Sequence, residues 1–199
     1  MQKGLSLPRL SGASICTVRQ DMDGRGFALV DTPPFFGERL PPRFRRQRMV
    51  LPSHDKRWWR LPELAQYACW LETMLDEALP EEAVSLTSLE FRHEPSGCED
   101  REVDRLHADG SYLRSVWTLY GPATIYRDGG IERQIPHGQT LLMTAVGRAR
   151  AVGVRCTLHR RPGAGPERAV IVCSFEPRPA EPPPVSLHRN VTQASERFS

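Results

Sequence analysis

The chain has 199 residues, of which 39% are hydrophobic and 26% charged, and its formal net charge is +3. This composition is typical of a globular protein with one main core, and no apolar run approaches the ~20 residues of a membrane span. The first ten residues lack the apolar stretch of a secretory signal, so we expect a cytoplasmic protein. The five cysteines include no Cys-x-x-Cys pair, which argues against a disulfide framework or a zinc ribbon.

The first part of the chain shows few regular patterns. Residues 1–24 have weak periodicity and are expected to be irregular, and a short strand is expected over 24–31. Residues 35–60 are rich in Pro and Arg and predict a long surface loop, in which we interpret the basic run 41–48 as solvated. Between 61 and 79, apolar residues recur every three or four positions, which predicts an amphipathic helix.

Short strands predominate after the predicted helix. Turns rich in Gly, Pro and Asp separate them, which is typical of an all-β sandwich or barrel with the helix packed outside. The Pro-rich segment 178–199 is expected to be a disordered tail. The predicted strands cover residues 83–92, 114–121, 123–130, 131–138, 139–146, 155–162 and 167–177.

One short motif places an imidazole and a carboxylate two residues apart, at His107-Ala-Asp109. Side chains at this spacing on an extended chain point to the same side. The pair alone fits a hydrogen-bonded polar turn better than half of a metal site. A metal site therefore needs support from elsewhere in the chain.

That support comes from His159 and Arg168. His159 ends one predicted strand, and Arg168 begins the next one after a Pro-Gly-Ala-Gly-Pro turn, so an antiparallel pair would bring both to the same end of the barrel. His107, Asp109 and His159 then form a two-histidine, one-carboxylate facial triad, which suits Fe(II) chemistry with O₂. Arg168 would be a permanently charged receptor for a carboxylate.

Taken together, these segments resemble the core of the Fe(II)/2-oxoglutarate-dependent dioxygenases, and among them the prolyl-hydroxylase-like branch. The resemblance implies a mainly β fold, a double-stranded β-helix (jelly-roll, cupin-like), with a flanking N-terminal helix. It implies that residues 1–82 pack on a catalytic core of residues 83–177, ahead of the tail 178–199. The matching segments, in chain order, are HAD, RSVWTLYGPAT, IPHGQTLLM, LHRRP and ERAVIVCSF.

The resemblance also implies roles for individual residues. His107, Asp109 and His159 would be the Fe(II) ligands. Arg168 would bind the distal carboxylate of the co-substrate 2-oxoglutarate, and Tyr120 matches a strand tyrosine that helps to hold the same carboxylate.

The expected reaction is hydroxylation, or a variant such as desaturation or cyclisation. Related halogenases replace the ligand carboxylate with a small residue, whereas Asp109 is present here. We expect a small-molecule substrate, such as an amino acid or a natural-product intermediate, with O₂ as the other reactant. Arg92 and Arg114 project from predicted strands near the site and are candidates for contacts with an anionic substrate.

Three other functions are alternatives to this one. An AlkB-like nucleic-acid demethylase would carry an Arg-x-Asn-x-Thr-x-Arg strand, but the strand that begins at Arg168 has no second arginine at that spacing. A non-catalytic, cupin-like metal- or ligand-binding module would leave the histidines with a structural role. A metalloenzyme that does not use 2-oxoglutarate would leave Arg168 without a function.

Overall fold

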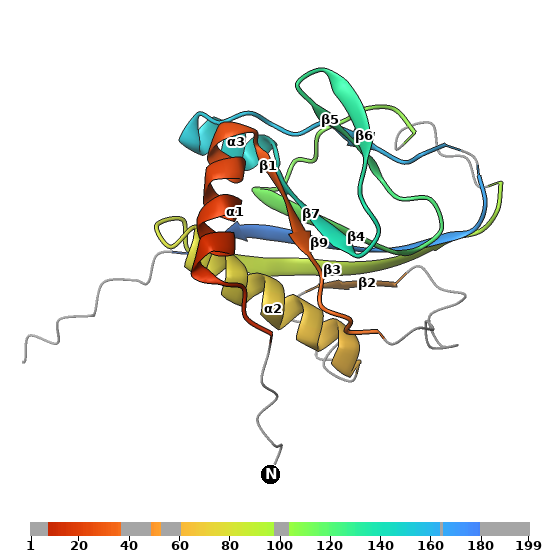
Figure 1. The fold of residues 1–199 in the computed structure, drawn as a ribbon, viewed down its shortest axis with the longest axis horizontal. Coiled ribbons are helices and arrows are strands. Elements are labelled where there is room, and N and C mark those ends of the chain that lie inside the picture. Colours follow the sequence, from red (N-terminus) through yellow and green to blue (C-terminus); the bar gives the residue numbers. More distant parts are fainter. Residues whose placement is uncertain (1–7, 37–48, 53–60, 98–103, 164, 180–199) are drawn as a thin grey trace, which may run out of the picture.

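The computed structural model describes residues 8–36, 49–52, 61–97, 104–163 and 165–179. The described part folds into two antiparallel β-sheets with three helices (Figure 1). The basic run 41–48 and nearly all of the expected tail lie outside the described residues.

The larger sheet has six strands in the order β1-β7-β4-β9-β3-β2. Strand β9 is central, because it pairs with β3 on one side and with β4 on the other. The two strands from the first third of the chain, β1 and β2, form the edges of this sheet. The bounds are β1 (Phe27–Asp31), β2 (Met49–Pro52), β3 (Val84–Glu94), β4 (Leu113–Tyr120), β7 (Gln139–Thr144) and β9 (Arg168–Pro177).

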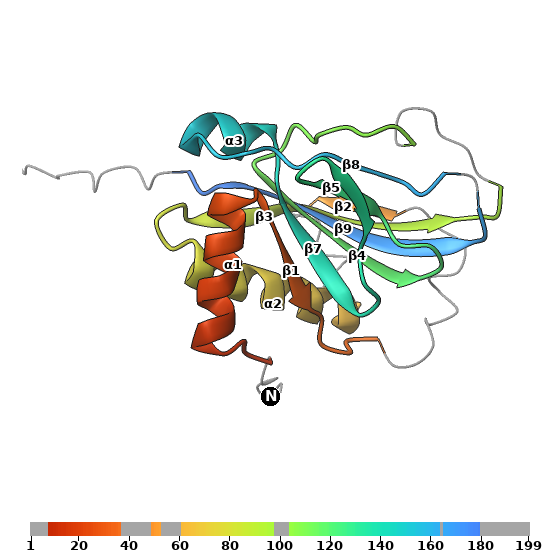
Figure 2. The ribbon, with the colours of Figure 1, turned by 45° about the horizontal axis from the view of Figure 1, so that its top comes forward.

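The smaller sheet faces the larger one and has the order β6-β5-β8 (Figure 2). It consists of β5 (Ile125–Asp128), β6 (Ile131–Gln134) and β8 (His159–Arg160). The strand predicted over 155–162 is therefore reduced to two residues. The reason is that Thr157 bonds elsewhere: its amide donates to the Thr144 carbonyl at 3.0 Å and its hydroxyl to the Gly26 carbonyl at 2.7 Å.

Helix α2 (Pro62–Ala78) confirms the helix predicted from the apolar periodicity. Helix α1 (Gly12–Gly24) corrects the expectation that residues 1–24 are irregular. Its start is capped by Ser11, whose hydroxyl accepts a hydrogen bond from the Ser14 amide at 3.2 Å. A third helix, α3 (Val146–Val152), follows β7 and was not predicted. Among the described residues, no helix combines the length and the apolar character needed to cross a membrane.

The larger sheet separates two apolar cores. On β9, the side chains of Ala169, Ile171, Cys173 and Phe175 join the core beneath α1 and α2, whereas Val170 and Val172 join the core between the sheets. This alternation follows from the two-residue period of a strand. It leaves one face of the sheet closed by helices and the other available for a site.

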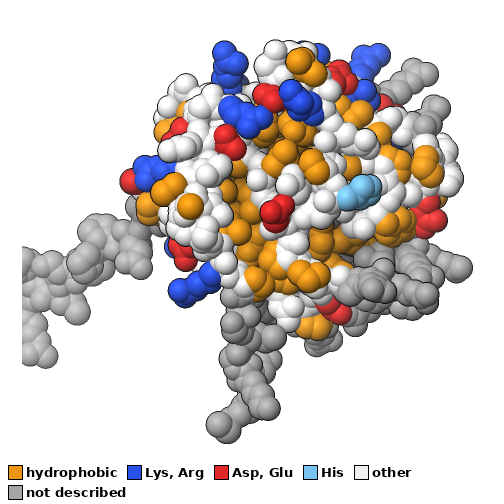
Figure 3. All heavy atoms as spheres, in the orientation of Figure 1, with side chains coloured by type: hydrophobic (Ala, Val, Ile, Leu, Met, Phe, Trp, Pro, Cys, Tyr) orange, Lys and Arg blue, Asp and Glu red, His pale blue; other side chains and the backbone are white. Residues whose placement is uncertain are grey.

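Figure 3 shows the outer face that carries α1 and β1. Hydrophobic side chains spread over its middle, and charged side chains of both signs lie among and around them. On this face, then, acidic and basic groups are interspersed, in keeping with the modest net charge of +3.

Candidate metal centre

Three side chains of types that can bind a metal meet between the two sheets. The ligand atoms of His107, Asp109 and His159 all lie within 4.8 Å of one another. The two histidines face each other across an antiparallel bridge, in which each backbone amide donates to the carbonyl of the other at 2.9 Å. Main-chain pairing thus brings together two residues that are far apart in the sequence.

Both histidines are held in a form that can bind a metal. The Nδ1 atom of His107 lies 2.8 Å from the Arg105 carbonyl, which can only accept, so Nδ1 donates; in the neutral imidazole the lone pair is then on Nε2. Burial lowers the pKa of His159 to about 4, although Asp109 acts in the opposite direction. His159 is therefore neutral at neutral pH, which is the form that ligates a metal.

The carboxylate of Asp109 has one satisfied oxygen and one unsatisfied oxygen. Its Oδ1 forms an ion pair with Arg114 Nη1 at 2.8 Å. Its Oδ2 is buried, lies 3.3 Å from His159 Nε2, and has no hydrogen-bond partner among the described residues. Leaving a buried carboxylate oxygen unpaired is costly, and a cation at this point would remove that cost. The donor set therefore fits a divalent metal such as Fe(II).

The triad opens into a cleft of about 500 Å³, a volume that includes its mouth. Apolar side chains from β4 and β9, Val116, Val170 and Val172, form part of its wall. The charged groups that line it are mostly guanidinium groups, from Arg92, Arg114, Arg160, Arg161 and Arg168.

Every arginine of the cleft has a carboxylate partner. The closest distances are 2.6 Å for Arg92–Glu90, 2.8 Å for Arg114–Asp109, 2.8 Å for Arg160–Glu132, 2.7 Å for Arg161–Asp104 and 2.8 Å for Arg168–Glu94. Each of the five pairs joins one positive and one negative charge, so the set is neutral overall. A bound divalent cation would therefore leave an excess of two positive charges, which a dianionic ligand would neutralise.

Arg168 is fixed at the start of β9 and is only 6% exposed. Its Nη1 donates to the Pro122 carbonyl at 3.1 Å and its Nε to Glu94. Burial lowers its pKa and Glu94 opposes that effect, and an arginine stays charged under either influence. Such a rigid, buried cation is suited to binding a carboxylate.

One geometric expectation needs correction. Arg168 and His159 were expected on two paired strands, but β8 pairs with β5, while β9 pairs with β3 and β4. The two residues still line the same cleft, because their sheets face each other.

The structure does not bring Tyr120 to the cleft. A register shift between Thr118 and Tyr120 interrupts the alternation of β4. The Tyr120 hydroxyl instead donates to Glu167 at 3.0 Å. Thr124, which the sequence reasoning missed, does line the cleft. Arg92 and Arg114 line it as expected.

Comparison with known proteins identifies the fold but gives no match in sequence. No protein-family model matches the chain, and neither does any curated protein. Among solved structures, the prolyl-4-hydroxylase of Pseudomonas putida is similar with a TM-score of 0.56 at 16% identity, over 89% of this chain and 100% of that one.

Two further solved structures have the same architecture. A Burkholderia pseudomallei oxidoreductase of the 2OG-Fe(II) oxygenase family has a TM-score of 0.52 at 11% identity, over 86% of this chain and 93% of that one. The dioxygenase for auxin oxidation 1 from Arabidopsis thaliana, solved with 2-oxoglutarate, has a TM-score of 0.55 at 9% identity and the same coverage, 86% and 93%. The expected double-stranded β-helix is thus confirmed, and this chain has the fold of the 2OG-Fe(II) oxygenases.

Proposed function

We propose that this protein is an Fe(II)- and 2-oxoglutarate-dependent oxygenase. The observation that carries the proposal is the joint presence, in one cleft, of the unsatisfied Asp109 oxygen between two histidines and of the buried Arg168. The charge balance supports it as well, because 2-oxoglutarate is a dianion at neutral pH. The similarity in fold to 2OG-Fe(II) oxygenases adds independent support.

In this proposal each residue of the site has a defined task. His107, Asp109 and His159 hold iron, and Arg168 binds the distal carboxylate of 2-oxoglutarate. When bound, the iron and 2-oxoglutarate supply the oxidising power for a reaction with O₂. Arg114 orients the Asp109 carboxylate so that Oδ2 faces the metal position.

The cleft walls limit the access of water. Val116, Val170 and Val172 present apolar surface in the cleft that the triad and Arg168 also line. Because water is excluded from such a site, the fixed charges act more strongly there.

We further propose that the substrate is a small anionic molecule, such as an amino acid or a natural-product intermediate, and that it is hydroxylated or otherwise oxidised. Arg92 and Arg114 each have a buried Nε–H group without an acceptor among the described residues. A substrate carboxylate would accept hydrogen bonds from such groups. One of the proteins of similar fold is a dioxygenase for auxin oxidation.

The decisive experiment is an anaerobic titration of the metal-free protein with Fe(II) and then 2-oxoglutarate. We expect a weak visible charge-transfer band that requires both additions and is absent in His159→Ala. Arg168→Met should still bind Fe(II), but its affinity for 2-oxoglutarate should fall about a hundredfold, since a charged hydrogen-bonded contact of roughly 3 kcal/mol is lost. Arg178→Met, which removes only an exposed pair with Asp76, is the matched control.

The substrate follows from a screen for succinate release in the presence of small carboxylates. Arg92→Met should raise the KM for the substrate and leave the KM for the co-substrate unchanged. The proposal is wrong if the wild-type protein binds no Fe(II), or if Asp109→Ala keeps full 2-oxoglutarate turnover.

A further inference from the structure

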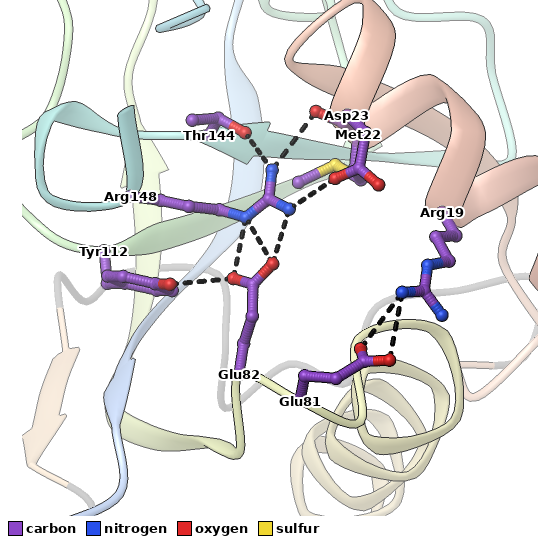
Figure 4. A network of polar contacts seen from close by, with 8 residues as sticks. All are labelled: Arg19, Met22, Asp23, Glu81, Glu82, Tyr112, Thr144 and Arg148. Carbon is purple, nitrogen blue, oxygen red and sulfur yellow. Dashed lines mark hydrogen bonds and ion pairs between the residues drawn. The ribbon is translucent and has the colours of Figure 1, made fainter. Parts of the chain in front are cut away.

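A buried cation, Arg148, lies outside the cleft. Arg148 of α3 is 0% exposed, and its guanidinium bonds to several parts of the chain (Figure 4). It donates to Glu82 at 2.6 Å and to Asp23 at 2.7 Å. It also donates to the Met22 carbonyl and to the Thr144 hydroxyl, each at 3.1 Å. These contacts tie α3 to the end of α1, to the turn before β3 and to β7.

Helix α3 in turn holds the segment that carries Asp109. The Val146 amide donates to the Asp109 carbonyl at 2.9 Å, and the Gly147 amide donates to the Ser111 carbonyl at 2.9 Å. The contact is close, because a Cβ atom on Gly147 would lie 2.9 Å from that same Ser111 oxygen. The backbone of a metal ligand thus rests directly on the first turn of α3.

A second path leads from Arg148 to His159. The hydroxyl of Thr144 accepts from Arg148, and its carbonyl accepts the Thr157 amide at 3.0 Å. Thr157 lies two residues before His159, and its hydroxyl is fixed on the Gly26 carbonyl at 2.7 Å. The same guanidinium therefore supports the backbone of two ligand-bearing segments.

We infer that Arg148 is a positioning residue for the metal centre. It keeps α3 and Thr144 in place, and these two hold the main chain at Asp109 and near His159. An arginine suits this position because its planar group offers five donors, and two carboxylates compensate its burial. The inference rests on the proposed function, since it assumes that the triad binds a metal.

The test uses Co(II) as the probe, whose visible absorption reports coordination directly. In the full-length metal-free protein, Arg148→Met should weaken Co(II) binding about tenfold to a hundredfold, the range found when groups that orient metal ligands are removed. Arg148→Lys keeps the charge but has fewer donors, and its affinity should be intermediate. Both measurements are made at a temperature at which circular dichroism shows each variant to be folded.

Two controls separate positioning from a general loss of stability. Arg19→Met removes the adjacent Arg19–Glu81 pair, whose closest contact is 3.0 Å and which touches neither ligand segment (Figure 4). Leu71→Ala removes a fully buried side chain of α2 and lowers stability from the face of the larger sheet that is opposite the cleft. Both should bind Co(II) as the wild type does. Wild-type affinity in Arg148→Met, or an equal weakening in Leu71→Ala, would overturn the inference.

A second readout does not depend on metal binding. If the wild type binds no Co(II), the proposed function fails. Hydrogen exchange of the Val146 amide in the metal-free protein then tests separately whether Arg148 holds the segment at Asp109 in place. Exchange that accelerates in Arg148→Met well beyond its acceleration in Leu71→Ala supports the positioning role. Equal acceleration in the two variants rejects it.

Discussion

Burial determines the protonation of His159 more than its charged neighbours do. Desolvation is the largest influence that lowers its pKa to about 4, and Asp109 is the largest that raises it. His107 and the nearby arginines act in the same direction as burial. The metal-free site therefore presents a neutral imidazole well below neutral pH.

This shift predicts how the stability of the metal-free protein depends on pH. The pKa of His159 is about 4 in the folded state against an ordinary value of 6.5, so the unfolded state binds more protons between these values. The contribution of His159 to the free energy of unfolding is complete above pH 6.5 and is lost as the pH falls to 4, by up to ~3 kcal/mol.

Urea denaturation of the metal-free protein at several pH values between 7 and 4 measures this loss. His159→Gln removes the titrating group and should show a smaller loss over the same interval. Identical pH dependence in both proteins would show that the histidine is not desolvated.

Single residues of the site were predictable from the sequence to different degrees. The spacing of His107 and Asp109, with His159 and Arg168 in strand context, was sufficient to predict a cluster that the structure brings together. The carboxylate partners of the arginines were not predicted, because pairs such as Glu94 with Arg168 depend on strand register. Tyr120 is not among the residues that line the cleft, and the register shift in β4 beside it leaves no trace in the residue pattern.

At the scale of whole elements, predictability followed the strength of the burial pattern. Helix α2 buries eight side chains along one face, and its period is plain in the sequence. Helix α1 buries only Val18 and Met22, and α3 has just seven residues, so neither gives a clear periodic signal. The two-residue strand β8 is likewise too short for any alternation to show.

The turn between β4 and β5 sets the position of the start of β9. Gly121 has a φ of +77°, and a Cβ atom there would lie 2.3 Å from the Glu167 carbonyl and 2.6 Å from the Arg168 Cβ. Gly121→Ala should therefore displace Arg168, weakening 2-oxoglutarate binding about tenfold or more, the loss expected from one misaligned charged hydrogen bond. Co(II) affinity should be close to that of the wild type, since the triad lies on other segments.

Isothermal titration with 2-oxoglutarate and with Co(II) separates the two effects. Gly129→Ala is the matched control, because Gly129 also has a positive φ, of +57°, but a Cβ atom there would meet nothing within 4 Å. Equal loss of 2-oxoglutarate affinity in both variants would mean that backbone strain, and not the displacement of Arg168, is responsible.

In the molecule as a whole, one face of the larger sheet packs against the helices and the other lines the cleft. Ile171 points into the helix-side core and is 0% exposed, whereas its neighbour Val172 lines the cleft. Ile171→Ala should lower the free energy of unfolding by about 2–5 kcal/mol and leave the KM for the co-substrate unchanged. Val172→Ala should cost less stability but alter the KM for the co-substrate or for the substrate.

Denaturant unfolding and steady-state succinate release, measured on both variants, test this division. A change of KM in Ile171→Ala at a temperature where the variant is folded would show that the two faces of the sheet are coupled. The sequence alone predicted a strand over 167–177, but not which of its faces meets the helices.

Under the proposed function, the main-chain bridge between His107 and His159 has a consequence for the kinetics of metal loading. Backbone hydrogen bonds already hold the two histidine residues opposite each other. The chain therefore has to move little when an ion binds. The slow step of capture would then be the release of water by the ion itself. Different divalent ions would load in the order in which they exchange water in solution, and a protein stripped of metal by a chelator would refill without refolding.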